Sequence, residues 1–332
     1  MSYLYITENG AVLSVDGGYF TVSYKNGLLH KIPKETLESV AFFGNVPVTT
    51  PCVRELLKRG IGLSYFSKNG AYYGRLESTA HNNIARLKKQ IFMSENKEFA
   101  LDIAKNIVKA KIKNQLVVLR RYAKNTSKNI DNDIQNMLYA LKHIEQTENH
   151  NELIGYEGTA AKSYFSALSD IIDTAFAFRG RNRRPPKDPF NSMISLGYTL
   201  LLYEIYGEIE NRGLSPYAGF LHRDNERHPT LASDLMEEWR AVIVDSVVLS
   251  LIQGKEISTE CFERDDETGG IFINKEGLNI FLKKYENKMR SLNKYINDMS
   301  MSYRRCLWNQ VSSLVKAIEE ENAEIYAPII IR

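Results

Sequence analysis

Short apolar and aromatic runs separated by turn residues make up the first part of the chain. SYLYIT, AVLSV, YFTVSY and LLHKI alternate with the turns ENG, DGG and KNG, and VAFFG, VPVTT, IGLSYFS and AYYGRL follow. Asn-Gly and Asp-Gly between such runs are strong hairpin signals. One helix is expected over residues 51–59, where VRELLKR ends at Gly60. The pattern predicts a small β-rich domain over residues 1–76.

The period of the apolar positions changes after a short connection at residues 77–83. From Ile84 onward the apolar residues recur at helical spacing over long stretches such as FALDIAKNIVKAKIKNQLVVLRRYA. Proline is absent between Val53 and Arg184, and this absence permits long helices because proline breaks them. We therefore predict an α+β protein, in which a linker at 77–83 leads into a larger all-α catalytic domain over residues 84–332.

Composition narrows the classes of protein that fit. The chain has 332 residues, of which 43% are hydrophobic and 25% charged, as in ordinary globular proteins of about two domains. Its net charge is +3, so overall charge says little about partners. The three cysteines lie far apart, in no metal-ligand or disulfide spacing, as expected in a reducing cytosol. No apolar run is long enough to span a membrane and no signal peptide is recognisable, so we expect a cytoplasmic location.

A histidine followed by two acids is the most informative local pattern. His222 ends an apolar segment, and a helix is expected over residues 231–252. Asp234 and Glu237 are three residues apart, so they would share a face of that helix. One histidine and two carboxylates that converge on one point suit a divalent metal that activates a phosphate. The alternative is that acids in the first turn only offset the helix dipole.

A further carboxylate, Glu157, lies among glycines and small residues in GYEGTAAKSYFSAL. If a helix begins near Gly158, this acid lies at the helix N-terminus, where offsetting the dipole is reason enough for its presence. The alternative is one more acid of the same site as His222. Spacing cannot decide between them, because 65 residues separate the two positions and only the fold can bring them together.

Two basic segments are candidates for contacts with phosphates. Every charged residue between Asp102 and Asp131 is basic: Lys105, Lys109, Lys111, Lys113, Arg120, Arg121, Lys124 and Lys128. A helix with such a run is typical of a surface that follows a phosphate backbone. The alternative is a solvated face that lies opposite acids elsewhere in the fold.

The second basic segment is the proline-stiffened loop FRGRNRRPPKDPFN. It contains Arg179, Arg181, Arg183, Arg184 and Lys187. Arginine presents forked donors that suit phosphate oxygens. The alternative is internal salt bridging, although five cations in nine residues are hard to pair internally.

Four segments together resemble the CRISPR-associated integrase and endonuclease family, the Cas-one proteins of spacer acquisition. The segments are VAFFGNVPVTTPCVRELLKRGIGLSYFSKNGAYYGRL, IGYEGTAAKSYF, NRRPPKDPFNSMISLGYTLL and LSPYAGFLHRDNERHPTLASDLMEEWR, in the family's order and spacing. The match covers nearly the whole chain. Glu238 and Trp239 depart from the family pattern, in which proline and phenylalanine are common before the arginine.

The resemblance implies a set of metal ligands. Glu157, His222 and Asp234 match the family's metal-binding positions. Glu237 occupies the neighbouring acid position, where binding directly or through water are both open. Oxygen and nitrogen ligands of this kind suit Mg²⁺ or Mn²⁺.

The resemblance also implies residues that contact DNA. The two basic segments would hold the DNA backbone, mostly without reading sequence. The DNA-binding candidates are Arg179, Arg181, Arg183, Arg184, Lys187, Lys109, Lys113 and Arg120. Tyr164 and Tyr217 lie beside the implied ligands, and one of them is a candidate for positioning DNA, with packing as the alternative for both.

The activity and the partners follow from the same resemblance. In the family, the 3′-hydroxyl of a short double-stranded DNA fragment attacks a phosphodiester at a CRISPR repeat boundary, a transesterification that needs no ATP. Water in place of the hydroxyl gives endonuclease activity. Members form homodimers through the β-domain, and two dimers flank a dimer of the small partner Cas-two. The alternatives are a hydrolytic metal-dependent nuclease of repair or defence, and a non-catalytic DNA-binding scaffold.

Overall fold

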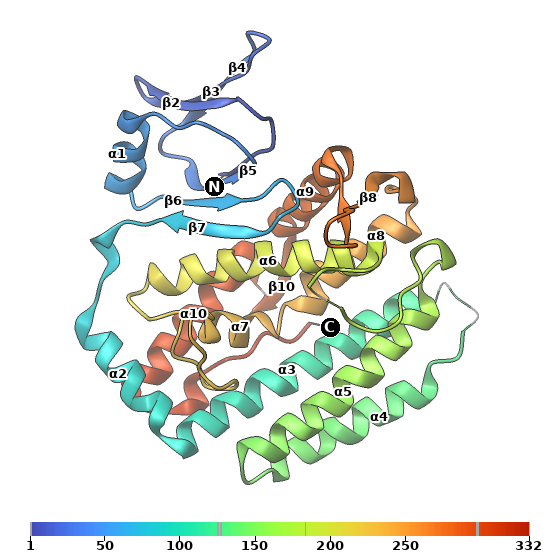
Figure 1. Cartoon of the computed structure of the whole chain (residues 1–332). Helices are drawn as coiled ribbons and strands as arrows, with labels where there is room; N and C mark the ends of the chain where they lie inside the picture. Colours follow the sequence, from blue (N-terminus) through green and yellow to red (C-terminus); the bar gives the residue numbers. More distant parts are fainter. Residues whose placement is uncertain (1, 125, 127, 183, 297–298, 332) are drawn as a thin grey trace.

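The structure is a computed structural model that describes residues 2–124, 126, 128–182, 184–296 and 299–331 (Figure 1). Strands gather in the N-terminal part and helices in the rest, so the predicted α+β class is confirmed. The helical part also holds two antiparallel hairpins that the sequence did not predict: β8 (Phe262–Arg264) with β9 (Ile271–Ile273), and β10 (Leu292–Ile296) with β11 (Met299–Ser302). None of the helices in the described residues is long and apolar enough to cross a membrane.

Two small sheets form the N-terminal part. The first is antiparallel, with β2 (Val12–Asp16), β3 (Tyr19–Ser23) and β4 (Leu29–Pro33). The second has the order β1 (Ser2–Ile6), β5 (Leu37–Phe43), β6 (Gly62–Phe66) and β7 (Tyr72–Leu76), with β7 as its antiparallel edge, and α1 (Thr50–Lys58) connects β5 to β6. The hairpin turns at Gly17 and Gly70 have φ angles of 52° and 83°. Glycine adopts these angles readily, which explains the hairpin signals in the sequence.

The second sheet packs on both of its faces. Val40 and Phe42 point to one side and join the core shared with α1 and the first sheet. Ala41 and Phe43 point to the other side and belong to the core of the helical part. On this side the sheet lies against α6 (Pro189–Glu210) (Figure 1). Alternation along the strands therefore joins the β-rich part directly to the helices.

Helices of different lengths build most of the remaining chain. They are α2 (Ile84–Glu95), α3 (Lys97–Ala123), α4 (Asp131–His143), α5 (His150–Ile171), α6, α7 (Thr230–Met236), α8 (Ser246–Gln253), α9 (Lys275–Arg290) and α10 (Tyr303–Glu320). Short 3₁₀ turns lie at Thr79–His81, Ile144–Gln146, Thr174–Phe176, Thr259–Cys261 and Ala323–Ile325. The long helix α3 contacts both α5 and α7. It therefore brings together two segments that are far apart in the sequence.

The helix expected over residues 231–252 is interrupted. α7 ends at Met236, residues 237–239 form a turn, and a π-helix, η4 (Arg240–Asp245), leads into α8. Insertions of this kind are frequent at functional sites. The expectation of one continuous helix was wrong, and the break lies immediately at Glu237.

Candidate active site

The loop before α7 is organised by one buried carboxylate. Asp234 has no exposed surface. Its Oδ2 accepts hydrogen bonds from the backbone N–H groups of Phe220 (2.8 Å) and Leu221 (2.9 Å). Its Oδ1 accepts one from the backbone N–H of His222 (3.2 Å) and lies 2.7 Å from Nδ1 of the same histidine. Both oxygens of Asp234 are therefore already engaged in fixing the loop and the ring of His222.

A glycine lets this loop approach the carboxylate. A Cβ atom at Gly219 would lie 2.5 Å from Cγ2 of Thr230 and 2.6 Å from Oδ2 of Asp234. Real Cβ atoms do not approach neighbours so closely, so any side chain here would push the loop away from Asp234. The glycine in the segment YAGFLH is thus the local sequence feature that permits the contact.

The contact with Asp234 determines how His222 presents its ring. A carboxylate only accepts hydrogen bonds, so Nδ1 carries the proton and Nε2 keeps a free lone pair in the neutral ring. The hydrogen bond to Asp234 raises the pKa of His222, against the opposing effect of burial. The side chain is 40% exposed. Asp234 therefore orients a histidine that is accessible from outside.

Glu157 and Glu237 converge on the same cation. The Lys111 ammonium on α3 makes an ion pair with Oε1 of Glu157 on α5, and its Nζ lies 2.7 Å from Oε2 of Glu237. The exposed fractions of the side chains are 7% for Lys111, 15% for Glu157 and 2% for Glu237. Arg240 approaches the other oxygen of Glu237, with Nη1 at 2.8 Å from Oε1. Three elements thus place two acids around one positive charge in a nearly dry setting.

Glu237 remains charged despite its burial. Burial raises the pKa of Glu237, but Arg240, Lys111 and His222 together outweigh it and lower the pKa to about 2. A protonated His222 is thus one of the positive charges that favour the ionised form of this carboxylate. The Oε2 atom of Glu237 is buried and lacks a partner in hydrogen-bond geometry, although Lys111 lies beside it as an ion. A buried, charged oxygen with spare acceptor capacity is what a metal ligand requires.

The structure therefore brings the predicted acids together in a different way from the one expected. Asp234 and Glu237 contact different partners, and neither lies in the first turn of α7, so offsetting the helix dipole does not account for them. Glu157 lies inside α5, seven residues after the helix begins at His150, so it is not an N-terminal acid either. Within the described residues, no three His, Cys, Asp or Glu side chains are close enough together to enclose a metal ion. Lys111 stands between the two that converge.

Two site residues were not singled out from the sequence. From the sequence alone Lys111 is one member of the basic run of its helix, and no pattern marks Arg240. A signal for Lys111 was present, because it lies at helical spacing from Val108 and Gln115 on the buried face of α3. A lysine at an apolar position is rarely buried without an anionic partner.

Tyr164 is a packing residue rather than a DNA contact. It has no exposed surface, and its hydroxyl donates to Oδ2 of Asp245 at 2.7 Å. Tyr198 donates to the other oxygen of Asp245, also at 2.7 Å. Burial raises the pKa of Asp245 to about 6, and the two hydroxyls moderate that rise. The structure therefore contradicts the suggestion that Tyr164 positions DNA, because its hydroxyl is already bound beneath the site.

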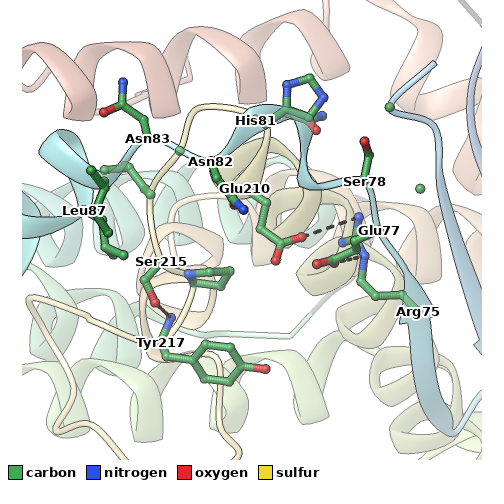
Figure 2. A pocket seen from close by; sticks show the side chains of 17 residues that line it. Arg75, Glu77, Ser78, His81, Asn82, Asn83, Leu87, Glu210, Ser215 and Tyr217 are labelled. Carbon is green, nitrogen blue, oxygen red and sulfur yellow. Dashed lines mark hydrogen bonds and ion pairs between the residues drawn. The ribbon is translucent and has the colours of Figure 1, made fainter. Parts of the chain in front are cut away.

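Tyr217 faces a separate cavity. The side chain is 45% exposed and borders a cavity of about 540 Å³ between β7, the start of α2 and the end of α6. Figure 2 shows the Glu77 and Glu210 carboxylates directed toward the Arg75 guanidinium on another wall. Burial and the neighbouring Glu77 raise the pKa of Glu210. Lys111, Glu157 and Glu237 do not line this cavity, and its acids disfavour a phosphate there.

The basic residues on α3 divide into engaged and exposed groups. Lys109 makes an ion pair with Glu145, with Nζ at 2.6 Å from Oε1, and Lys111 is buried. For these two lysines the alternative interpretation applies, in which the basic residues of α3 pair with acids from elsewhere in the fold. Lys113 and Arg120 are exposed, and they stay candidates for contacts with DNA.

The arginine-rich loop divides in the same way. Arg181 donates to Oδ1 of Asn191 (2.8 Å) and to Oγ of Ser195 (3.1 Å), so its guanidinium fastens the loop to α6. The exposed members are Arg179, Arg184 and Lys187. Arg183 lies outside the described residues. The loop thus keeps exposed cations while one arginine has an internal role.

Comparison with known proteins places these observations in a family. The model of the family described as CRISPR associated protein Cas1 matches residues 4–287. The CRISPR-associated endonuclease Cas1 of Mycobacterium tuberculosis is 36% identical over 321 residues, covering 96% of this chain and 94% of its own. A solved Cas1 protein from Thermotoga maritima has a TM-score of 0.80 at 26% identity, covering 96% of this chain and 97% of its own. A chain of a Cas6-RT-Cas1–Cas2 complex has a TM-score of 0.83 at 26% identity, covering 98% of this chain and 36% of its own.

Proposed function

The chain belongs to the Cas1 family of CRISPR-associated endonucleases, and on this premise we propose that it is a metal-dependent DNA integrase. The 3′-hydroxyl of a short DNA fragment attacks a phosphodiester of the CRISPR repeat, forming one phosphorus–oxygen bond as another breaks. Hydrolysis with water as the nucleophile gives the endonuclease activity. The observation that carries the proposal is the convergence of Glu157 and Glu237 on one cation, and His222 is among the charges that lower the pKa of Glu237.

The chemistry of the donor atoms fits a divalent metal, although Lys111 now lies between the two acids. Glu157, Glu237 and His222 would hold Mg²⁺ or Mn²⁺, because they offer buried carboxylate oxygens and an imidazole lone pair. When bound, the metal polarises the scissile phosphate and stabilises the charge that builds on it. Asp234 fits a supporting role better than the ligand role implied by family resemblance, since both oxygens of its carboxylate already interact with donors of residues 220–222. A carboxylate that holds the far nitrogen of a metal-binding histidine is a common arrangement.

The protein's own groups prepare the site for an anionic substrate. Asp234 keeps the Nδ1 proton of His222 in place and leaves Nε2 as the free nitrogen. Arg240 keeps Glu237 ionised within its buried surroundings. His222 also borders an open cavity of about 610 Å³ whose wall includes the cations Lys97 and Arg223. A DNA strand that enters there would meet the Lys97 and Arg223 cations, with the acids Glu95 and Asp224 on the same wall.

DNA and protein partners complete the proposal. The exposed cations Arg179, Arg184, Lys187, Lys113 and Arg120 would follow the backbone of double-stranded DNA. A homodimer formed through the β-rich part and a complex with the small partner Cas2 would hold the two DNA substrates. The similarity to a chain of a Cas6-RT-Cas1–Cas2 complex supports the second partner.

A strand-transfer assay tests this function. Wild type and His222→Ala, each with Cas2 and Mn²⁺ or Mg²⁺, are incubated with a labelled short duplex and a supercoiled plasmid that carries the repeat. We expect joined product with wild type and none with the variant. Nicking without joining by wild type would instead indicate a hydrolytic nuclease. Equal joining by both proteins would refute the proposed site, and a scaffold would show no chemistry with either.

A further inference from the structure

The cation between the two acids is a lysine of the protein itself. Lys111 is on the buried side of α3, among the apolar residues of the main core. Its ammonium is in ion-pair contact with Oε1 of Glu157 and lies 2.7 Å from Oε2 of Glu237. Burying an ammonium and two carboxylates is costly unless their charges are balanced, and here Lys111 and Arg240 together balance Glu157 and Glu237. The lysine therefore keeps two buried acids together that would otherwise repel each other.

A metal ion and this ammonium would compete for one place. The carboxylates that would hold a divalent ion are the same two that the Lys111 ammonium contacts. The Lys111 Nζ already lies within contact distance of both oxygens, so the two cations would overlap or repel strongly. Arg240 is held by the other oxygen of Glu237 and does not occupy this place.

We propose that Lys111 is an exchangeable counter-cation, which keeps Glu157 and Glu237 converged without metal and leaves their shared position when the metal binds. This inference rests on the proposed function, since it assumes that these acids hold the metal. Exchange of one cation for another keeps the acids neutralised in both states. The lysine thereby lowers the affinity for metal while it preserves the arrangement of the ligands, which makes it a positioning residue.

The proposal predicts opposite effects for two substitutions of the same lysine. Lys111→Met keeps most of the apolar side chain but removes the competing charge, so the metal should bind more tightly. Lys111→Arg keeps the charge and adds a planar fork that pairs with carboxylates at two points, so the metal should bind more weakly. Lys113→Met is the matched control, because Lys113 lies two residues further along the same helix but is exposed. Lys113→Met changes the net charge by the same amount as Lys111→Met, but solvent and salt screen the effect of an exposed charge on the metal site.

The measurement is Mn²⁺ binding to the full-length protein without DNA, followed by electron paramagnetic resonance of free Mn²⁺ or by calorimetry. We expect the dissociation constant to fall at least 10-fold in Lys111→Met, to rise at least 3-fold in Lys111→Arg and to stay within 2-fold in Lys113→Met. Thermal unfolding with EDTA and with Mn²⁺ gives a second readout. The melting temperature of Lys111→Met should be below that of wild type in EDTA, and Mn²⁺ should raise it by more than it raises wild type.

The outcomes separate this inference from the proposed function. Glu237→Gln identifies which part of the Mn²⁺ binding belongs to this site. If that part has equal or weaker affinity in Lys111→Met than in wild type, the exchange is refuted while the metal site stands. If neither protein binds Mn²⁺ in a Glu237-dependent way, the metal site and the exchange are both refuted. If Lys111→Met does not fold, Lys111→Arg decides: unchanged or tighter binding refutes the exchange.

Discussion

Glu237 and Glu238 are neighbours in the chain and both are buried, but their surroundings drive their pKa values in opposite directions. Burial raises the pKa of each carboxyl. At Glu237 the charges of Arg240 and Lys111 overcome this effect and lower the pKa to about 2. At Glu238 burial prevails and raises the pKa to about 8. One acid is therefore ionised at neutral pH, whereas the other is mostly protonated.

The difference lies in the partners rather than in the depth of burial. Glu238 interacts with the hydroxyl of Tyr326 and accepts a hydrogen bond from the backbone N–H of Ile329 at 2.8 Å. Asn114 on α3 links the same segment, since its Nδ2 lies 2.8 Å from the carbonyl oxygens of Glu238 and Ile329. Uncharged donors thus tie residues 326–331 beneath the site. The charged acid is paired with Lys111 and Arg240, and its neutral neighbour fastens the C-terminal segment.

The largest test of this comparison exchanges each acid for its amide. Glu237→Gln removes the charge that the proposed metal needs, so we expect strand transfer to fall by more than about 100-fold, the upper end of what losing a partner of a metal ligand costs. Glu238→Gln resembles the protonated acid already present, so strand transfer should stay within about 3-fold of wild type, because the hydrogen bonds can be kept. Strand-transfer rates of the two variants are measured side by side. A similar loss of activity in both would contradict the difference inferred between Glu237 and Glu238.

The second test concerns the acid that orients His222. Asp234→Asn puts an N–H₂ group among backbone N–H donors and removes the acceptor that fixes the ring. We expect Mn²⁺ affinity and strand transfer to fall by about 10- to 100-fold, the range for residues that support a metal ligand. Asp224→Asn is the control, since Asp224 is exposed in the same loop and accepts a 3.1 Å hydrogen bond from the backbone N–H of Gly219, which an asparagine oxygen can also accept. An equal loss in both variants would mean that the loop, rather than the orientation of His222, matters.

The third test uses pH. The pKa of Glu238 is raised in the folded protein, so its contribution to stability is fully present below the pKa of the unfolded chain and is lost as pH rises through about 8. The free energy of unfolding of wild type should therefore fall relative to Glu238→Gln by at most about 1.4 kcal/mol for each pH unit between about 4.3 and 8. Urea unfolding of both proteins at pH 5, 7 and 9 measures this. A difference that does not depend on pH would show that Glu238 is ionised in both states.

Local signals in the sequence predicted much of the fold. The turns at Gly17 and Gly70 were recognisable because glycine is needed for their positive φ angles. The long helix α3 was recognisable from its apolar period. The interruption of the helix after Met236 was not, because residues 231–252 contain neither proline nor glycine to mark it. Tertiary contacts of the surrounding core decide that conformation.

The candidate site was predicted in its residue types but not in its contacts. His222, Asp234 and Glu237 are close in sequence, so their proximity was expected. The division of roles between Asp234 and Glu237 depends on the turn that separates them and on partners from elsewhere in the chain. Glu157 meets Lys111 from 46 residues away, and a separation of this kind is determined by how α3 and α5 pack. The spacing of residues along the chain does not show how α3 and α5 pack against each other.

A fourth test weakens the neutral network at one point. Tyr326→Phe removes the hydroxyl that contacts Glu238 but keeps the ring in the core. We expect the free energy of unfolding to fall by about 1 kcal/mol, the usual contribution of one hydrogen bond. Strand transfer at a temperature where the variant is folded should be unchanged. A large loss of activity without a loss of stability would show that the supporting network also tunes the chemistry.

The smallest expected effect concerns how the partners of a cation limit its contacts with DNA. A lysine that is paired with a carboxylate should contribute less to DNA binding than an exposed lysine. Lys109 is paired with Glu145, whereas Lys113 on the same helix is exposed. We expect Lys113→Ala to weaken duplex binding a few-fold and to reduce the slope of log affinity against log salt by roughly 0.9, as the loss of one phosphate contact does. Lys109→Ala should change both quantities less, because Glu145 already neutralises that charge. Fluorescence anisotropy over a salt series compares the two variants. Equal slopes would mean that partners inside the protein do not limit which cations of α3 reach the DNA.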